Sequence, residues 1–336
     1  MASTAGRARR GAKSACMNRE PRFPAHDEHD EAGCGSHFIL LRKEVPVSNP
    51  PCILTIAGSD SGGGAGIQAD IKTITILGGF STSVITALTA QNGVGVDAIH
   101  APEPGFVAQQ LKTVRDGFPI AAAKTGMLYS APIIEAVSAG LRGRSFPLVV
   151  DPVCVSQSGQ PLLREDAVNA LKWHILPHAD LLTPNRPEAE LLAGRAIRVP
   201  ADIPVVARIL LGMGPKAVLI KGGHFGEGIS PVDAVLSNNA VCTDWLALPD
   251  TAVVQLPQPV GRTSNNHGTG CTLSAAIATY LGMGLELKEA IMRAQRYLNH
   301  CLRHGYTPGL GAGPPDHASW IARRADEHHL PSLATL

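Results

Sequence analysis

From Pro51 onward, short apolar runs alternate with longer segments of helical periodicity. The apolar runs are rich in β-branched residues and predict buried strands at 52–57, 82–88, 120–125, 147–151, 179–183 and 216–221. Helical patterns lie between them, near 64–78, 103–116, 131–141, 164–174, 186–193 and 202–212. Such alternation is typical of an α/β fold in which helices cover both faces of a mostly parallel sheet.

The pattern changes between residues 232 and 256. Two apolar segments, 232–236 and 241–245, flank the turn-forming residues 237–240 and predict a β-hairpin at an antiparallel edge of the sheet. Two helices, near 270–283 and 287–303, close the pattern. We find no internal repeat, and we expect one domain at 50–318 followed by a C-terminal tail at 319–336.

Residues 1–49 have a different composition. The first nineteen are basic and contain no Asp or Glu, and residues 26–31 form a polar, acidic block. Such a segment offers too little apolar surface to order itself, so we predict a disordered extension. A transit peptide, a plain extension and an upstream start codon with Met17 as the alternative start all stay open. The block at 26–31 is expected to be solvated rather than a metal site.

Bulk composition narrows the function classes. The chain has 336 residues, with 29 basic and 28 acidic side chains and 4% aromatic residues, which argues against a nucleic-acid-binding surface. Its seven cysteines are irregularly spaced, as in proteins of a reducing compartment, and we expect a cytoplasmic location. No apolar run approaches the roughly 18 residues that a membrane span requires, so we expect no membrane insertion.

The segment around Gly268-Thr269-Gly270 carries the clearest chemistry. It leads into an apolar, alanine-rich helical segment, 271–281, so its backbone N–H groups would lie at a helix N-terminus, where an anion is favoured. Cys271 falls in the first turn, where a thiol pKa is lowered and a thiolate becomes a candidate base. The alternative is a glycine turn that opens a helix with an inert, buried cysteine.

A second glycine-rich loop, 58–66, follows the strand at 53–57 and precedes a predicted helix. This layout is typical of a phosphate or small-ligand site at the carboxyl end of a parallel strand. The loop is not a Walker A motif, because no Gly-Lys-Ser/Thr follows at the required spacing.

Polar residues follow three predicted strands: Asp151, the pair Asn185 and Glu188, and Lys221. In open α/β sheets, ligands bind outside the carboxyl ends of the strands. Two carboxylates and a lysine there suit Mg²⁺ and nucleotide phosphates. Each residue alone could equally be local structure, with Asp151 and Glu188 as caps and Lys221 as a surface charge.

Together these segments resemble the hydroxymethylpyrimidine/phosphomethylpyrimidine kinases of thiamine biosynthesis, a family of the ribokinase-like superfamily. The resemblance runs in order from about Pro51 to about His317 and rests on the motifs at 57–70, 83–92, 124–128, 221–224 and 267–274. It implies a ribokinase-like three-layer α/β/α fold, with a mostly parallel central sheet and antiparallel edge strands. It also implies ATP- and Mg²⁺-dependent phosphorylation of 4-amino-5-hydroxymethyl-2-methylpyrimidine and then of its monophosphate.

The resemblance also implies roles for individual residues. Gln91 would hydrogen-bond the aminopyrimidine, because an amide both donates and accepts. The other substrate-binding residues would be Gly58, Ala65, Met127 and Asp70. Gly268, Thr269 and Gly270 would hold the γ-phosphate, and Cys271 stands where the wider superfamily has an aspartate base. Lys221, Asn185 and Thr183 would bind the nucleotide, and Asp151 and Glu188 the metal ion.

Two departures from the family pattern are visible. The loop after Asp151-Pro152 has Cys154 and Gln157 where family members often carry Met and Lys, which puts that loop's charge stabilisation, and with it the second phosphorylation, in question. Asn266 replaces the usual Thr before the histidine.

Two other functions stay open: a pyridoxal or pyridoxine kinase, and a pyrimidine-binding protein without catalysis. Intact Gly268-Thr269-Gly270-Cys271 and Lys221 argue against the second. The expected partners are a small pyrimidine and ATP, with neither nucleic acid nor membrane, and the expected assembly is a homo-oligomer, in the first place a dimer.

Overall fold

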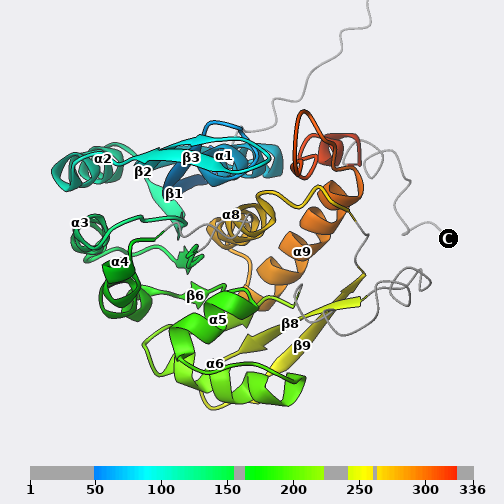
Figure 1. The fold of residues 1–336 in the computed structure, drawn as a ribbon. Coiled ribbons are helices and arrows are strands. Elements are labelled where there is room, and N and C mark those ends of the chain that lie inside the picture. Colours follow the sequence, from blue (N-terminus) through cyan, green and yellow to red (C-terminus); the bar gives the residue numbers. More distant parts are fainter. Residues whose placement is uncertain (1–48, 155–162, 223–240, 260–262, 324–336) are drawn as a thin grey trace, which may run out of the picture. The chain divides into compact units, whose positions relative to one another are not determined.

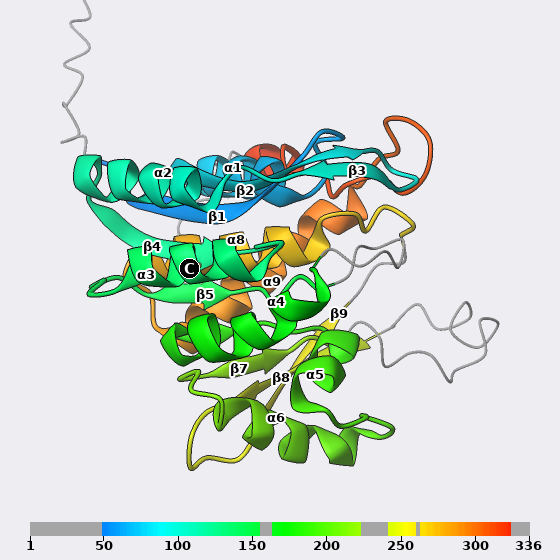
Figure 2. The ribbon, with the colours of Figure 1, turned by 60° about the vertical axis from the view of Figure 1, so that its left-hand side comes forward.

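The structure is a computed structural model that describes residues 49–154, 163–222, 241–259 and 263–323. The described residues form a nine-stranded sheet in the order β3-β2-β1-β4-β5-β6-β7-β8-β9, which Figure 2 shows from the side. Strands β2, β1, β4, β5, β6 and β7 run parallel, β3 is antiparallel to β2, and β8 and β9 form an antiparallel edge. The predicted α/β class, with its antiparallel edge strands, is confirmed.

The strands have the following bounds: β1 Cys52–Asp60, β2 Phe80–Gln91, β3 Val96–His100, β4 Ile120–Thr125, β5 Leu148–Val150, β6 Leu181–Leu182, β7 Val218–Ile220, β8 Val241–Ala247 and β9 Val254–Pro259. The α-helices are α1 Gly66–Leu77, α2 Pro104–Gly117, α3 Ala131–Leu141, α4 Glu165–Ala170, α5 Arg186–Ala193, α6 Ile203–Leu211, α8 Thr269–Gly282 and α9 Leu287–Arg303. A π-helical segment, Leu171–Ile175, and a 3₁₀ turn, Leu176–His178, continue α4, and a second 3₁₀ turn, Pro200–Asp202, precedes α6.

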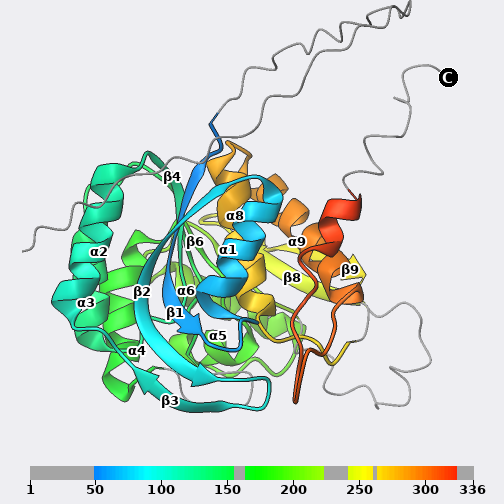
Figure 3. The same ribbon diagram turned by 90° about the horizontal axis from the view of Figure 1, so that it is seen from above.

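Helices cover both faces of the sheet, as Figures 1 and 3 show. Alternating strand residues point to opposite faces: Leu54 and Ile56 of β1 join the core under α2 to α6, whereas Ile53 joins the core under α1, α8 and α9. The second core also takes in Trp320, whose ring packs edge-on against Tyr297 of α9 with 5.4 Å between ring centroids. The packed chain therefore continues past residue 318.

One predicted helix differs from the structure, one strand was missed, and one predicted hairpin lies partly outside the described residues. Strand β3 was not predicted, because its residues are mostly exposed or half-buried at the sheet edge and form no apolar run. The helix predicted at 164–174 changes its hydrogen-bond pattern after Ala170. The first arm of the predicted hairpin, 232–236, lies outside the described residues; the second arm lies in β8, which pairs antiparallel with β7 and β9.

Candidate active site

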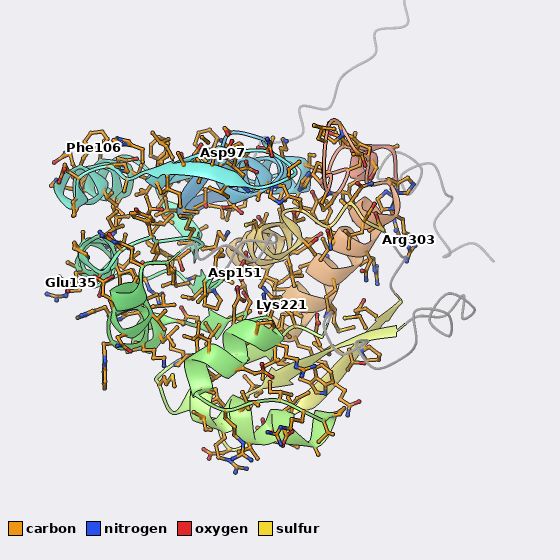
Figure 4. All side chains as sticks on the ribbon, in the orientation of Figure 1. Asp97, Phe106, Glu135, Asp151, Lys221 and Arg303 are labelled. Atoms are coloured by element: carbon orange, nitrogen blue, oxygen red, sulfur yellow. The ribbon has the colours of Figure 1, made fainter. Side chains whose placement is uncertain are left out.

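Most of the predicted site residues lie near the carboxyl ends of the parallel strands or at the N-terminus of α8, whereas Asp70 lies within α1. Figure 4 shows two of them, Asp151 and Lys221, near the centre of the view.

Among the described residues, no helix is both long enough and apolar enough to cross a bilayer.

The two glycine-rich loops, which are far apart in the sequence, pack directly against each other. A Cβ atom built on Gly268 would lie 1.9 Å from the carbonyl oxygen of Gly64, and one built on Gly64 would lie 2.4 Å from Cδ2 of His267. Gly268 also has φ = 84°, a conformation that L side chains rarely adopt. Glycine is therefore favoured at both positions, and the N-terminus of α8 packs directly on the first loop.

Asp60, at the end of β1, organises the first loop. Its buried carboxylate accepts hydrogen bonds from the backbone N–H groups of Gly62 (2.8 Å), Gly64 (3.0 Å) and Ala65 (2.8 Å). It also lies 2.9 Å from Nε2 of His267. Burial raises the pKa of this carboxyl group, but the hydrogen bonds from His267 and the backbone outweigh burial and hold the pKa below its ordinary value.

Gln91 ends β2 beside this cluster. Its Nε2 lies 3.4 Å from Nε2 of His267, and its Oε1 lies 3.1 Å from the hydroxyl of Thr89. Ser61 from the glycine loop bonds both the N–H and the carbonyl of Gln91, at 2.8 Å each. The amide predicted to read the substrate is thus adjacent to both glycine loops.

An apolar wall lies beside the first glycine loop, and one of its residues, Val96, pairs with Gln91 across β2 and β3. Met127, after β4, packs against Ala87, and its sulfur would lie 3.2 Å from a Cβ atom on Gly58. Half-buried apolar residues surround this pair: Val96, Ile99, Tyr129 and Val153. Ala65, the N-cap of α1, sits at the junction of the glycine loops. The structure therefore brings Gly58, Ala65, Met127 and Gln91 together.

Helix α8 begins at Thr269 with Gly268 as its N-cap, close to the predicted start. Thr269 donates two hydrogen bonds to the carbonyl of Asn266, one from its backbone N–H and one from its hydroxyl. The N–H groups of Gly270 and Cys271 follow in the first turn, where a helix provides no acceptor of its own. A Cβ atom on Gly270 would lie 3.2 Å from Nζ of Lys221 and 3.3 Å from Oδ2 of Asp151. The first turn of α8 therefore faces the charged cluster at the strand ends.

The predicted lowering of the Cys271 pKa is wrong for the ligand-free protein. Burial raises the pKa of the Cys271 thiol to about 11; the ammonium of Lys124 lowers it, and the carboxylates of Asp70 and Asp151 raise it. A hydrogen bond from the N–H of Gly66 also favours the thiolate. Burial outweighs Lys124 and the Gly66 N–H, so the resting group is a thiol.

Asp151, Lys221 and Glu188 form the charged cluster. Nζ of Lys221 lies 2.9 Å from Oδ1 of Asp151 and 3.9 Å from Oε2 of Glu188. Thr183 and Ser274 place their hydroxyl groups 3.4 Å from the two oxygens of Asp151. Lys221 is therefore not a free surface charge.

Glu188 has a local structural role as well. Asn185 caps α5 with its side-chain oxygen on the N–H of Glu188, and Glu188 accepts the N–H of Asn185 in return, which is a capping box. Burial raises the pKa of Glu188 to about 7; Lys221 lowers it and Asp151 raises it. The predicted capping role of Glu188 is confirmed, and its role as a metal ligand stays a prediction.

Asp70 is fully buried beneath the site. Lys124, also fully buried, places its Nζ 3.0 and 3.1 Å from the two carboxylate oxygens of Asp70, and Thr55 donates a 2.5 Å hydrogen bond to one of them. Asp70 presents no exposed surface to a ligand, unlike Gln91.

Sequence reasoning gave no role to Asp60, His267 or Lys124. All three lie within the motifs that carried the family resemblance. A lysine at the end of an otherwise apolar strand was the available signal for Lys124, whereas the Asp60–His267 contact joins residues 207 positions apart.

Two of the residues that depart from the family pattern, Cys154 and Asn266, lie within the described part of the chain. Cys154 is buried, donates its S–H to the carbonyl of Pro152, and gives its backbone N–H to Glu188. Asn266 supplies the carbonyl that receives Thr269, a role open to any residue. Gln157 lies outside the described residues.

The sheet order and the position of α8 define the class of protein: the chain is a kinase with a ribokinase-like fold. The profile of the phosphomethylpyrimidine kinase family matches residues 60–316, and the chain belongs to that family.

Known proteins agree with this placement. A hydroxymethylpyrimidine/phosphomethylpyrimidine kinase of Haemophilus influenzae is 44% identical over 81% of this chain and 98% of its own length. A thiamine biosynthesis bifunctional protein, ThiED, of Geobacter sulfurreducens is 46% identical over 83% of this chain, but the match spans only 54% of that longer protein.

Among solved structures, a phosphomethylpyrimidine kinase of Clostridium difficile shares 38% identity, with a TM-score of 0.62 over 74% of this chain and 97% of that one. A pyridoxal kinase of Bacillus subtilis in complex with ADP shares 29% identity, with a TM-score of 0.71 over 82% of this chain and 100% of that one.

Proposed function

We propose that this kinase transfers the γ-phosphoryl group of ATP to 4-amino-5-hydroxymethyl-2-methylpyrimidine, and then phosphorylates the resulting monophosphate to the diphosphate, in thiamine biosynthesis. One observation carries the proposal: the glycine loops at 58–66 and 268–270 pack into a single site. Met127 of the apolar wall contacts the first loop at Gly58, and Gln91 lies between Ser61 of that loop and His267 beside the second. A phosphate on the first turn of α8 would face a heteroaromatic ring on that wall.

Several residues of this chain have distinct roles in the proposed reaction. The substrate hydroxyl oxygen attacks the γ-phosphorus, the bond to the bridging oxygen breaks, and ADP leaves. First-turn N–H groups of α8 and the ammonium of Lys221 stabilise charge on the transferring phosphoryl group. Thr183 and Asn185 lie beside this cluster, which supports their proposed role in nucleotide binding.

Cys271 is the proposed acceptor of the hydroxyl proton. Because the resting group is a thiol, only the thiolate form of Cys271 can take the proton. In a loose phosphoryl-transfer transition state the proton leaves late, when bond formation to phosphorus has made the attacking hydroxyl acidic, and the thiolate then becomes a thiol. Lys124 and the N–H of Gly66 both favour the thiolate. Asp70 takes part through Lys124, since both of its oxygens are bonded within the protein.

Asp151 and Glu188 fit a Mg²⁺ ion. Both supply hard carboxylate oxygens, and Mg²⁺ in nucleotide sites uses one or two protein carboxylates together with phosphates. The raised pKa of Glu188 marks a buried place where negative charge lacks full compensation, even with Lys221 present. When bound, the ion would neutralise phosphate charge; Asp151 and Glu188 would hold it.

Two outcomes would favour other functions. The similarity to pyridoxal kinases motivates pyridoxal as the rival substrate, and a pyrimidine-binding protein would show binding without turnover. The decisive assay measures ADP release with the hydroxymethylpyrimidine, its monophosphate and pyridoxal side by side, with Lys221→Met as the inactive reference. Turnover of pyridoxal alone, or binding without ADP release, would refute the proposal. Turnover of the alcohol without the monophosphate would confine the protein to the first step.

We also propose a cytoplasmic location and a homodimer. The described cysteines, Cys52, Cys154, Cys242, Cys271 and Cys301, are all free thiols, which supports a reducing compartment. Light scattering on the purified protein tests the dimer, and a monomeric mass would refute it.

A further inference from the structure

His267 contacts more parts of the site than any role assigned above requires. Its Nε2 lies 2.9 Å from Asp60 at the end of β1 and 3.4 Å from the amide of Gln91 at the end of β2. Its ring packs against Gly64, and its backbone N–H donates to the carbonyl of Gly313 at 3.1 Å. The residue that follows it is Gly268, the N-cap of the phosphate-binding helix.

The contact with Asp60 fixes where the ring carries hydrogen. The Asp60 carboxylate already accepts three backbone N–H groups and holds a pKa below its ordinary value, so it is ionised and accepts only. Nε2 of His267 must therefore carry a hydrogen and donate it to Asp60. That nitrogen then has no lone pair left for a second donor.

The side-chain amide of Gln91 should therefore present an acceptor, not a donor, to the Nε2–H of His267. With Nε2 of Gln91 toward His267, two donors face each other at 3.4 Å. In the same orientation, the hydroxyl of Thr89 has two acceptors, Oε1 of Gln91 at 3.1 Å and the carbonyl of Ser59 at 3.0 Å, but only one hydrogen to donate. Both conflicts involve the same amide.

A half-turn of the amide removes both conflicts at once. Oε1 of Gln91 then faces the Nε2–H of His267 and shares that hydrogen with Asp60 in a three-centre hydrogen bond, with Asp60 as the nearer acceptor. Nε2 of Gln91 donates to the hydroxyl oxygen of Thr89, whose hydrogen goes to the carbonyl of Ser59. Every donor in the chain from Asp60 to Ser59 then meets an acceptor. Because the half-turn exchanges Oε1 and Nε2 of Gln91, it also reverses the order in which the amide presents its donor and its acceptor to the edge of a bound ring.

We propose that His267 is a positioning residue that determines specificity: its Nε2–H, directed at Asp60, holds the Gln91 amide with Oε1 toward His267 and so sets the donor–acceptor order presented to the substrate ring. The proposal rests on the proposed function, in which Gln91 reads a heteroaromatic ring. A site built to match a fixed polar pattern discriminates strongly between ring edges, because a mismatched substrate leaves buried groups unpaired.

The first test needs no substrate. Long-range ¹H–¹⁵N spectra of the ligand-free, full-length protein report which ring nitrogen of each histidine carries hydrogen, and His267→Gln identifies the His267 signals. Hydrogen on Nε2 of His267 is expected. A ring with hydrogen on Nδ1 alone would overturn the proposal, because Nε2 would then accept from Gln91 and leave its amide unturned.

The second test is a double-mutant cycle on pyrimidine affinity, measured by calorimetry, with His267→Leu, Gln91→Leu and the double variant. We expect His267→Leu to weaken binding about tenfold in the wild-type background and less than twofold in the Gln91→Leu background. His267→Leu should also reduce the ratio of aminopyrimidine affinity to pyridoxal affinity. His267→Gln, which keeps a hydrogen-bond donor, should retain most of the wild-type affinity.

A matched control separates this role from general support of α8. His317 is a second buried histidine, with Nε2 3.0 Å from the hydroxyl of Thr272 in the first turn of α8. His317→Leu should have the same effect on affinity in both Gln91 backgrounds. Equal effects of His267→Leu in the two backgrounds would overturn the proposal. Wild-type protein that binds no aminopyrimidine would instead refute the proposed function, while the spectra still decide the proton position.

Discussion

The buried Lys124–Asp70 pair allows a sharp test of the physical reasoning. Both side chains are fully buried, Lys124 bonds both oxygens of Asp70, and burial raises the pKa of Asp70 despite this partner. Removing one member of such a pair leaves the other charge without compensation, which costs about 3–5 kcal/mol. Since domains are stable by about 5–15 kcal/mol, Lys124→Met should lower the free energy of unfolding by a large fraction.

The loss should depend on pH in a defined direction. Without Lys124, the folded-state pKa of Asp70 rises further above its unfolded value, so the folded variant holds a proton that the unfolded chain releases. This proton stabilises the variant below the unfolded pKa, near 4, and the benefit is lost as pH rises toward the folded-state pKa. The deficit of Lys124→Met relative to wild type should therefore be smaller at pH 5 than at pH 7.5.

Urea unfolding followed by circular dichroism at both pH values measures this. The double variant Lys124→Met/Asp70→Leu should recover most of the loss, because apolar replacements of a buried pair are often neutral. Lys112→Met is the control, since its pair with Asp116 is mostly exposed and should contribute at most about 1 kcal/mol. A single variant within about 1 kcal/mol of wild type at pH 7.5, or a double variant no better than the single one, would refute the reasoning.

Three further predictions concern the site. Cys271→Ala should lower kcat by roughly 10²–10⁴-fold with little change in pyrimidine affinity, whereas Cys301→Ala, in the core under α9, should not; near-normal turnover would leave Cys271 a packing residue. Gln91→Leu should weaken pyrimidine binding by roughly 1–3 kcal/mol in calorimetry, and unchanged affinity would exclude it as the ring reader. Because the pKa of Cys271 is raised to about 11, its alkylation by iodoacetamide, followed by mass spectrometry, should quicken about tenfold per pH unit from pH 8 to 10; a rate already constant by pH 8 would contradict that shift.

The sequence predicted the parallel strands and most helix bounds well, because buried strands and amphipathic helices carry periodic apolar patterns. The helix at 131–141 and the one at 287–303 have the predicted bounds. Strand β3 was missed because an exposed edge strand needs no apolar run. Element type followed from local patterns, and edge pairing did not.

The sequence predicted which charged residues would lie near one another but not how the parts of the candidate site are connected. Asp151, Glu188 and Lys221 were expected together from their positions after parallel strands, and they form one cluster. The predicted direction of the Cys271 pKa shift was wrong, because the shift depends on how deeply the fold buries the thiol and on which charges surround it. Asp60 and His267 escaped notice because neither has a local pattern that indicates its partner.

The Asp60–His267 contact has a consequence for biosynthesis. The two residues are separated by 207 positions, so at ribosomal rates of about 5–20 residues per second the second half of the site emerges on the order of 10–40 s after the first. During that interval the loop at 58–66 lacks the helix N-terminus that packs on it, and the nascent chain cannot turn over its substrate. Catalytic competence should therefore arise late and abruptly on the ribosome, when α8 docks.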